Sequence, residues 1–404
     1  MAWVEQSGKT SFRVRFVKPD GTLGSEPGFP TRAAANTRAN LLEAEKATGT
    51  FADRSGGQTL FAAWTDTWLV NVCDVDVRTE AEYRSKIRNH LLPQWGGTPL
   101  REITASSVTG WAKSLRGKGL ADTTVKDIVK LFCLIVEDAV EEKLLTASPI
   151  PRRRKRRGRR MPTTPVREKV WATPEQVLRI CDQAALVYGT AGAVLLATAA
   201  YTGARWGELV GLQRHNLNLD EGWLRVDPRT GSLHESSDGR LWLGPPKTPG
   251  SARTIALPPF LLPILAGYLD SHDHRHVFVT PDHGLHYRGN FRKRCTVPAA
   301  WGHPNATKPV LRTRPVCPGL TVHGLGHGHK TWMIADAIPD VAQARRLGHK
   351  LPHRIDDIYS HVADEVEHRL LVALQNRWAT GLGGPDGGQP VPEWRRATPP
   401  AMAL

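Results

Sequence analysis

A Pro- and Arg-rich stretch at residues 149–170 most limits how this chain can fold, because it contains no periodic apolar pattern. Stretches of this composition interrupt helices and strands and mark domain boundaries. It separates residues 58–148, which carry only helical patterns, from residues 171–380, where helical and strand patterns both occur. We therefore expect a mainly α-helical chain with small β elements, divided into several domains.

The same stretch contains the run RRRKRRGRR, eight basic side chains in nine positions. With 54 Lys and Arg against 39 Asp and Glu, the whole chain has a formal net charge of +15. Basic surfaces neutralise phosphates and release counterions, so double-stranded DNA is the first partner to consider. A solvated linker extended by self-repulsion is the alternative, and both can hold at once. The candidate DNA-contacting residues of the run are Arg152, Arg153, Arg154, Lys155, Arg156, Arg157, Arg159 and Arg160.

Several classes of protein are disfavoured by the composition. The five cysteines are scattered without a CxxC pair, which argues against a disulfide framework or a cysteine zinc site. The longest apolar run, residues 190–204, is shorter than the ~20 residues that span a bilayer. The first ten residues lack the apolar core of a signal peptide. We expect a cytoplasmic protein, nucleoid-associated when bound to DNA, with no membrane partner.

Residues 1–50 predict a small ββ(β)α unit. The segment 11–17 alternates as a strand does, and residues 32–47 read as a helix. Arg13 and Arg15 would form a basic edge for DNA, and ordinary surface charge is the alternative.

Residues 58–148 predict four amphipathic helices whose apolar stripes form a core rather than a cofactor site. The region 171–380 opens with a Thr173–Gln176 capping box and one long apolar helix that ends near Gly203. Further along we expect a helix at 205–212, strands at 223–227, 240–243 and 254–257, and a last helix at 364–379. The Gly- and Pro-rich tail 381–404 is expected to be disordered.

The segment 202–209, TGARWGEL, delivers Arg205 at the start of a helix with Glu208 three residues on. An Arg there can hold a phosphate bidentately, helped by the helix N-terminus. A surface Arg paired with Glu208 is the alternative. Lys247 lies between two predicted strands, where a lysine on a hairpin tip can reach into a groove and donate a proton.

His323 and His327 are four residues apart, a spacing that invites a metal site. Zinc proteases need Glu next to the first His, where this chain has Gly324, and no acidic third ligand follows. The HDHRH segment at 272–276 is interpreted as an exposed loop. We therefore expect no metal. Two further features follow, Leu-Gly-His ending at His349 and, ten residues later, Tyr359.

In chain order these features are an Arg, a Lys between strands, His-x-x-x-His, Leu-Gly-His and a Tyr, and the set resembles the tyrosine recombinases, the family of phage integrases. The motifs TGARWGEL, LGHK and DIYSHV carry the resemblance, which spans the whole of 171–380. It implies an arm-type DNA-binding unit at 1–50, a helical, SAM-like core-binding domain at 58–148, a basic linker at 149–170 and a mixed α+β catalytic domain at 171–380. The Arg- and Trp-rich composition is typical of integrases from phages and integrative elements of high-GC actinobacteria.

The resemblance also implies a mechanism. Tyr359 would attack the scissile phosphate and form a 3′-phosphotyrosyl link, which keeps the bond energy and needs no cofactor. Around it, Arg205 would clamp the phosphate and Lys247 would donate a proton. His323 and His349 would complete the phosphate pocket, and Glu208 would orient Arg205. The expected partners are double-stranded DNA attachment sites, three further copies in a DNA-bound tetramer, and an excisionase or a host DNA-bending protein.

One position departs from the family, whose motif is His-x-x-Arg-His with the Arg as a second phosphate clamp. Here that place is Gly326. Three interpretations stay open: an impaired or inactive recombinase that still binds DNA, a substitute cation such as Lys330 or Arg345, or a variant of an active lineage. The alternatives to a recombinase are a catalytically inactive protein that occupies attachment sites, a relaxing topoisomerase and, more distantly, a zinc hydrolase.

Overall fold

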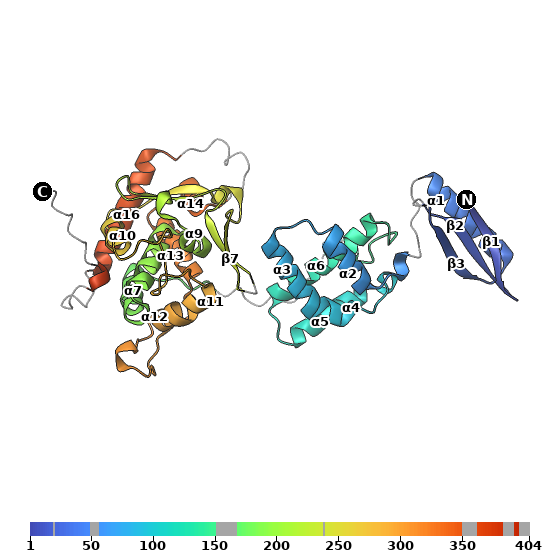
Figure 1. Cartoon of the computed structure of the whole chain (residues 1–404), viewed down its shortest axis with the longest axis horizontal. Coiled ribbons are helices and arrows are strands. Elements are labelled where there is room, and N and C mark those ends of the chain that lie inside the picture. The colour runs from blue at the N-terminus through green and yellow to red at the C-terminus, as the bar shows by residue number, and fades with distance from the viewer. Residues whose placement is uncertain are drawn as a thin grey trace. The chain divides into compact units, whose positions relative to one another are not determined.

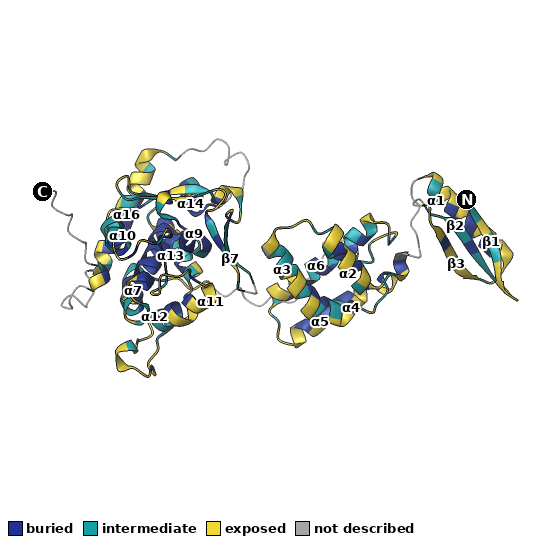
Figure 2. Ribbon diagram, in the orientation of Figure 1, coloured by how far each residue is buried: buried dark blue, intermediate teal, exposed yellow. Residues whose placement is uncertain are grey.

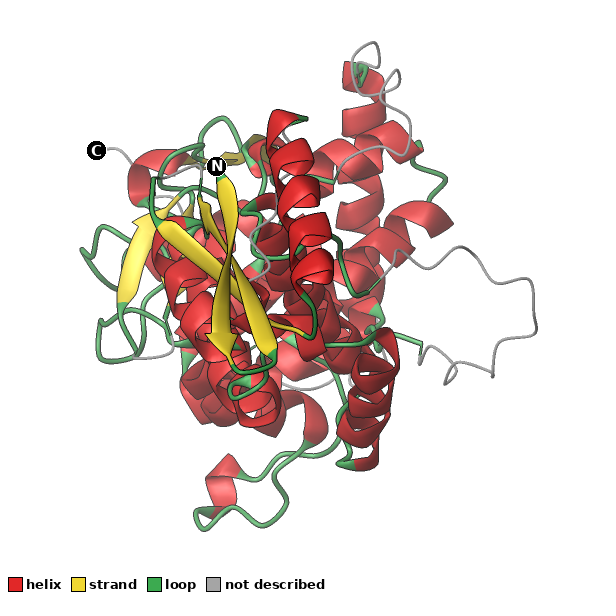
Figure 3. Ribbon diagram, turned by 90° about the vertical axis from the view of Figure 1, so that its right-hand side faces the viewer, coloured by secondary structure: helices red, strands yellow, loops and turns green. Residues whose placement is uncertain are grey.

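The computed structural model describes residues 1–18, 21–48, 56–150, 168–236, 239–349, 362–382 and 392–395. The chain divides into two compact units, Met1–Met161 and Pro162–Leu404. Within the described residues, helices predominate and strands are confined to three small sheets (Figure 1, Figure 3). The expectation of a mainly α-helical chain with small β elements is confirmed.

The first unit begins with an antiparallel sheet of β1 (Ala2–Gly8), β2 (Ser11–Val17) and β3 (Leu23–Phe29), in that order. Helix α1 (Arg32–Ala47) follows, and the Thr31 hydroxyl caps it by accepting the backbone N–H of Ala34. The alternating pattern of β2 turns Val14 and Phe16 inward, where both are fully buried. These side chains share a core with the inner face of α1, so this part of the chain has a hydrophobic core of its own.

The helical part of the first unit surrounds a second core rich in tryptophan. Trp95, Trp111 and Phe132 meet there with ring centroids 5.1–5.7 Å apart. Trp64 is buried as well, and its indole N–H donates to the carbonyl oxygen of Ile135 at 2.8 Å. The elements are α2 (Phe61–Asn71), α3 (Val77–Lys86), a π-helical turn (Ile87–Leu91), α4 (Leu92–Trp95), α5 (Ala105–Gly117) and α6 (Asp122–Glu141).

The second unit opens with two helices where the sequence predicted one, α7 (Pro174–Tyr188) and α8 (Thr190–Thr202). Gly189 separates them with a φ of 78°, which a β-carbon would strain. The predicted capping box is confirmed, because the Thr173 and Gln176 side chains each accept the other residue's backbone N–H. Nearly every residue of α8 is buried, so this helix lies at the centre of the largest core.

The strands of the second unit form two sheets rather than one series. One has the order β4 (Leu217–Asn218), β5 (Trp223–Val226), β8 (Arg253–Ala256), and the other pairs β6 (Ser232–Glu235) with β7 (Leu241–Gly244). All pairs are antiparallel. The segment between β7 and β8 therefore connects two sheets and is not the hairpin tip that the sequence suggested.

Helices surround α8 and bring distant segments together. They are α9 (Trp206–Val210), α10 (Leu261–Leu269), α11 (Arg288–Phe291), a π-helical turn (Arg292–Thr296), α12 (Val297–Trp301), α13 (Val322–Ala335) and α14 (Asp340–Leu347). In Figure 2, where buried residues are dark blue, α9 is mostly buried, whereas α13 has buried, intermediate and exposed residues. The N-terminal end of α9 and the less buried face of α13 carry the residues described below.

Helix α16 (Asp364–Leu382) packs on the core of its own chain through Leu370, Leu374 and Trp378. The Trp378 ring stacks on Phe260, with centroids 4.1 Å apart and an interplanar angle of 9°. Beyond it, Trp394 is buried in a 3₁₀ turn (Glu393–Arg395), and its indole N–H donates to Asp182 at 2.9 Å. The disordered tail expected for 381–404 is therefore wrong at these positions, because an aromatic anchor orders them.

Among the residues that the structure describes, no helix combines the length and apolar character needed to cross a membrane.

Candidate active site

Arg205 is held at the junction of two helices. Helix α8 ends at Gly203, which adopts the left-handed conformation with a φ of 67°. A β-carbon there would come within 2.6 Å of the Leu347 side chain and 2.9 Å of the His329 ring, so only glycine fits. The chain then turns sharply, and Arg205 becomes the N-cap of α9.

The guanidinium of Arg205 belongs to a buried ion triad. Its Nη1 donates to Oε1 of Glu208 at 2.8 Å, and its backbone N–H donates to Oε2 at 2.9 Å. Arg253 on β8 donates to the same Oε2 from its Nη2, also at 2.9 Å. The side chains of Glu208 and Arg253 are 3% and 7% exposed, whereas that of Arg205 is 28% exposed. Arg205 is therefore the member of the triad that can reach an external anion.

The carboxyl of Glu208 is ionised in this setting. Burial alone would raise its pKa, but the charge and hydrogen bond of Arg253 and the hydrogen bonds of Arg205 outweigh that effect. The pKa of Glu208 is lowered as a result.

Two further contacts fix the direction of Arg205. Nη1 donates to the hydroxyl of Ser251 at 3.0 Å, and Nη2 donates to the carbonyl oxygen of Gly348 at 3.1 Å. The Ser251 hydroxyl also bonds that of Thr248 at 2.9 Å, next to Lys247. The three segments that carry Arg205, Lys247 and His349 are thus joined through one guanidinium and one serine.

Helix α13 lines the same region with His323, Gly326, His327 and Lys330, which share a face at helical spacing. The two imidazoles meet edge to face with centroids 4.6 Å apart. Among the described residues, and apart from its own helix backbone and chain neighbours, a β-carbon at Gly326 would have only the carbonyl oxygen of Gly203 within 4 Å, at 3.7 Å. The position that differs from the family motif therefore has room for a side chain.

Positive charges gather around these histidines. Burial lowers the pKa of His323, and the charges of Lys169, Arg205, Arg288 and Lys247 lower it further. Burial also lowers the pKa of His349, with further contributions that begin with Arg205 and Lys330. Cations that depress the pKa of a neutral imidazole also attract an anion, so the region suits a phosphate.

Lys247 and Lys330 are both exposed, on the β7–β8 connection and on α13 respectively. Neither has an ion-pair partner among the residues that the structure describes. Both amines are therefore available to a ligand, and their roles stay predictions.

The third histidine of α13 is structural. His329 is fully buried, and its Nε2 accepts the Nε–H of Arg346 at 2.9 Å. Its Nδ1 must then carry the proton and donate to the carbonyl oxygen of Ala200 at 3.0 Å. Arg346 is itself buried and donates to the carbonyl oxygens of Ala256 and Tyr201. The pair joins α8, α13, α14 and β8 behind the candidate site.

Some predicted residues lie outside the described part of the chain or have other partners. Tyr359 and the basic run 152–160 fall outside the described residues. Arg13 and Arg15 on β2 both form ion pairs with Glu5 of β1, at 3.0 and 3.2 Å. Their contact with DNA remains a prediction.

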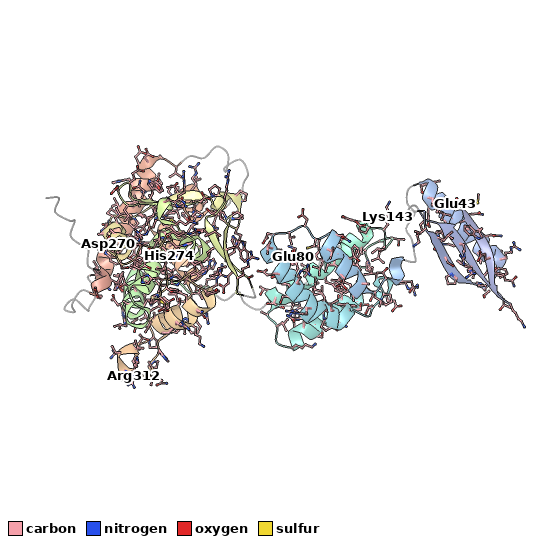
Figure 4. All side chains as sticks on the ribbon, in the orientation of Figure 1. Glu43, Glu80, Lys143, Asp270, His274 and Arg312 are labelled. Carbon is pink, nitrogen blue, oxygen red and sulfur yellow. The ribbon has the colours of Figure 1, made fainter. Side chains whose placement is uncertain are left out.

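The segment 272–276 is a loop, as the sequence suggested, but it is only partly exposed. His272 and His276 are 7% and 3% exposed, and the His272 ring contacts Tyr268 of α10 with centroids 5.1 Å apart. Asp273 and Arg275 of the same segment are exposed. Figure 4 labels the side chains of Asp270 and His274 in this region. Within the described ranges, no group of three His, Cys, Asp or Glu side chains could hold a metal ion.

Four residues of the region were missed from the sequence. Ser251 and Arg253 lie in a short turn and strand, and Lys169 and Arg288 come from segments far apart in the chain. Charge alone gives no local signal of such convergence. A partial signal for Arg253 was its spacing of two residues from Ile255, because residues two apart on a strand face the same side and Ile255 is buried.

No protein-family model matches the chain, but known proteins resemble it in sequence and in fold. The chain is 24% identical over 345 residues to the ICEBs1 integrase of Bacillus subtilis, covering 82% of this chain and 88% of that protein. It is 23% identical over 332 residues to a protein of Caldanaerobacter subterraneus named "Tyrosine recombinase XerC-like", covering 77% of this chain and 81% of that protein.

Solved structures show the same fold. The Tn1549 transposon integrase in complex with a circular intermediate DNA superposes with a TM-score of 0.59 at 16% identity, covering 78% of this chain and 99% of that one. A λ integrase tetramer bound to a Holliday junction gives a TM-score of 0.51 at 16% identity, covering 90% and 98%. These relatives and neighbours are integrases and tyrosine recombinases, and the chain has the fold that they share.

Proposed function

We propose that this protein is a site-specific DNA recombinase that integrates or excises a phage or mobile element through a 3′-phosphotyrosyl intermediate. The observation that carries the proposal is the arrangement of Arg205. It is fixed by Glu208, Ser251 and the Gly348 carbonyl, yet it is partly exposed beside His323. Likeness to integrases in sequence and fold supports the same class.

In the proposed reaction the Tyr359 hydroxyl oxygen bonds to the scissile phosphorus as the bond from phosphorus to the 5′-oxygen breaks. The phenol proton passes to solvent, and Lys247 delivers a proton to the departing 5′-oxygen. The neutral amine of Lys247 then takes a proton back from solvent, so protons and charge balance over the step. Arg205, His323 and His349 hold the non-bridging oxygens, whose negative charge grows in the transition state. Preorganised cations and donors stabilise such a state without reorganisation. Rejoining reverses the step with a different 5′-hydroxyl.

The partners follow from the same proposal. Double-stranded attachment sites are the substrate, and four copies assemble on DNA, as the λ integrase tetramer does on a Holliday junction. Arg13, Arg15 and the basic run 152–160 contact phosphates, which position the protein rather than read bases. An excisionase or a host DNA-bending protein assists, and the element is of the actinobacterial phage or integrative type.

A second candidate function is favoured by Gly326, which removes the second clamp of the family motif. A chain without that donor can still bind attachment sites through its basic surface, and so act without catalysis. Loss of one preorganised donor typically costs ~10²–10³ in rate, which impairs a recombinase without abolishing it. Lys330, one turn beyond Gly326 on the same helix, is the candidate replacement cation.

A nicked suicide duplex separates the two functions. The attachment site is read from direct repeats that flank the gene, and a nick near the scissile phosphate lets the short 5′-hydroxyl strand diffuse away. A covalent adduct that maps to Tyr359 supports the recombinase. Tight, site-specific binding without any adduct supports the binding protein instead.

A further inference from the structure

The side chains of Arg205, Glu208 and Arg253 form a triad of two cations and one anion. Arg205 and Glu208 alone would be a neutral pair, because one guanidinium faces one carboxylate at 2.8 Å. A neutral pair attracts a phosphate weakly, since the carboxylate already satisfies the cation. Arg253 on the opposite carboxylate oxygen changes this balance, and the three groups together carry one net positive charge.

All three guanidinium nitrogens of Arg253 donate hydrogen bonds to acceptors of its own chain. Its Nε donates to the carbonyl oxygen of Arg346 at 2.6 Å, its Nη1 to that of Ser251 at 2.7 Å, and its Nη2 to Glu208. With all three nitrogens engaged and the side chain 7% exposed, it is not placed to hold an external anion itself. Its influence on a bound phosphate passes through Glu208 to Arg205.

We propose that Arg253 is a positioning residue that shares the charge of Glu208 and so keeps Arg205 cationic toward the scissile phosphate. Arg253 also ties β8 to α14 through the Arg346 carbonyl, two residues before the Gly348 carbonyl that orients Arg205. The residue therefore sets both the net charge and the direction of the clamp. This role rests on the proposed function, because it assumes that Arg205 holds phosphate.

The test uses the full-length chain and inorganic phosphate as the probe, so it does not depend on cleavage. Arginine is labelled with ¹⁵N, and the Nε signal of Arg205 is assigned by its absence in Arg205→Lys. Phosphate should shift this signal in the parent. In Arg253→Met the apparent Kd should rise on the order of 10-fold, because one charge near the site is lost.

Three variants separate charge from folding. Arg253→Lys loses much of the hydrogen-bonding geometry but keeps the charge, so its phosphate affinity should stay within a few-fold of the parent. Adding Glu208→Gln to Arg253→Met restores the net charge and should recover affinity. Arg225→Met removes an equal charge from an exposed position on the neighbouring strand β5 and should change nothing.

The outcomes are distinct. Unchanged phosphate affinity in Arg253→Met overturns the proposal. So does an equal loss in the Met and Lys variants without recovery by Glu208→Gln, because that pattern describes a purely structural residue. A parent whose Arg205 signal ignores phosphate also overturns it. If the proposed function fails instead, the parent forms no covalent adduct on nicked DNA. The phosphate titration then still shows whether Arg253 affects the binding of phosphate at Arg205.

Discussion

Gly326 on α13 faces the carbonyl oxygen of Gly203 at the end of α8, and a β-carbon on Gly326 would lie 3.7 Å from that oxygen. No other atom of the described chain lies within 4 Å of that β-carbon position, beyond the glycine's own helix backbone and chain neighbours. Gly203 precedes Arg205 by two residues, so the open position borders the turn that carries the proposed phosphate clamp. A longer side chain at Gly326 would enter the same region as Arg205.

We therefore expect Gly326→Arg to raise the rate of DNA cleavage by on the order of 10²-fold or more, because it returns a preorganised cation to the site. Helix propensity also favours the change, since Arg is better than Gly inside a helix by about 0.5–1 kcal/mol. The measurement is the rate of covalent adduct formation on a nicked suicide duplex.

Two further variants are measured in the same cleavage assay. Gly110→Arg adds the same charge at another helical glycine with open space around it, and should leave the cleavage rate unchanged. Lys330→Ala tests the replacement cation. A parent that cleaves briskly, is slowed by Lys330→Ala and gains nothing from Gly326→Arg contradicts the impaired-enzyme interpretation.

Tyr359→Phe should abolish the covalent adduct and leave DNA affinity nearly unchanged. Only a hydroxyl is lost, whereas the basic surface that supplies most of the affinity remains. Adduct is detected on denaturing gels and affinity by fluorescence anisotropy. A Phe variant that forms adduct at the parent's level would show that another residue is the nucleophile.

Replacement of the basic residues in 152–160 by Gln should weaken binding to all DNA sequences alike. Cations that contact phosphates release counterions, so log K should depend less steeply on log salt, by up to about 0.9 per lost contact. The comparison needs a specific and a random duplex across several salt concentrations. An unchanged slope would mean that the run is solvated and contacts no phosphate.

The sequence predicted the parts of the fold that depend on local patterns. The helix at 32–47 and the Thr173–Gln176 capping box follow from hydrophobic periodicity and capping chemistry, which act over a few residues. Motif spacing also named Arg205 and His323 before the structure placed both in one region. Their chemical roles remain predictions.

What the sequence missed depends on tertiary packing. Gly189 breaks an apolar run that reads as one helix, and only its positive φ reveals the break. His276 and Trp394 lie in polar segments of the sequence, which predict exposed side chains. Neighbouring elements bury both side chains, and local polarity gives no sign of this. Arg253 joins the site through an ion pair with Glu208, 45 residues away, a distance that no local pattern spans.

Trp378→Ala should destabilise the second unit by about 3–5 kcal/mol, the usual cost of truncating a buried large aromatic residue. The side chain is 6% exposed and stacks on Phe260, so α16 loses its main anchor. A drop in Tm on the order of 10 °C is expected for a unit of this size. Leu382→Ala, at a side chain 47% exposed, is the control and should move Tm little. Equal Tm values for the two variants would mean that α16 does not stabilise its own chain.

The last prediction concerns acid stability and His286. This side chain is 1% exposed beside Tyr188 and Phe291, and burial lowers its pKa from an ordinary value near 6.5 to about 4. Between those values the unfolded chain binds a proton that the folded chain does not, so stability falls as the pH drops through that window. When the pH falls from about 7.5 to about 5, the free energy of unfolding should decrease in both proteins. The decrease should be about 1–2 kcal/mol smaller in His286→Gln than in the parent. Thermal melts of both proteins at the two pH values measure this, and exposed His303→Gln serves as the control. If His286→Gln and the parent lost the same stability on acidification, His286 would have to be protonated or solvated in the folded protein.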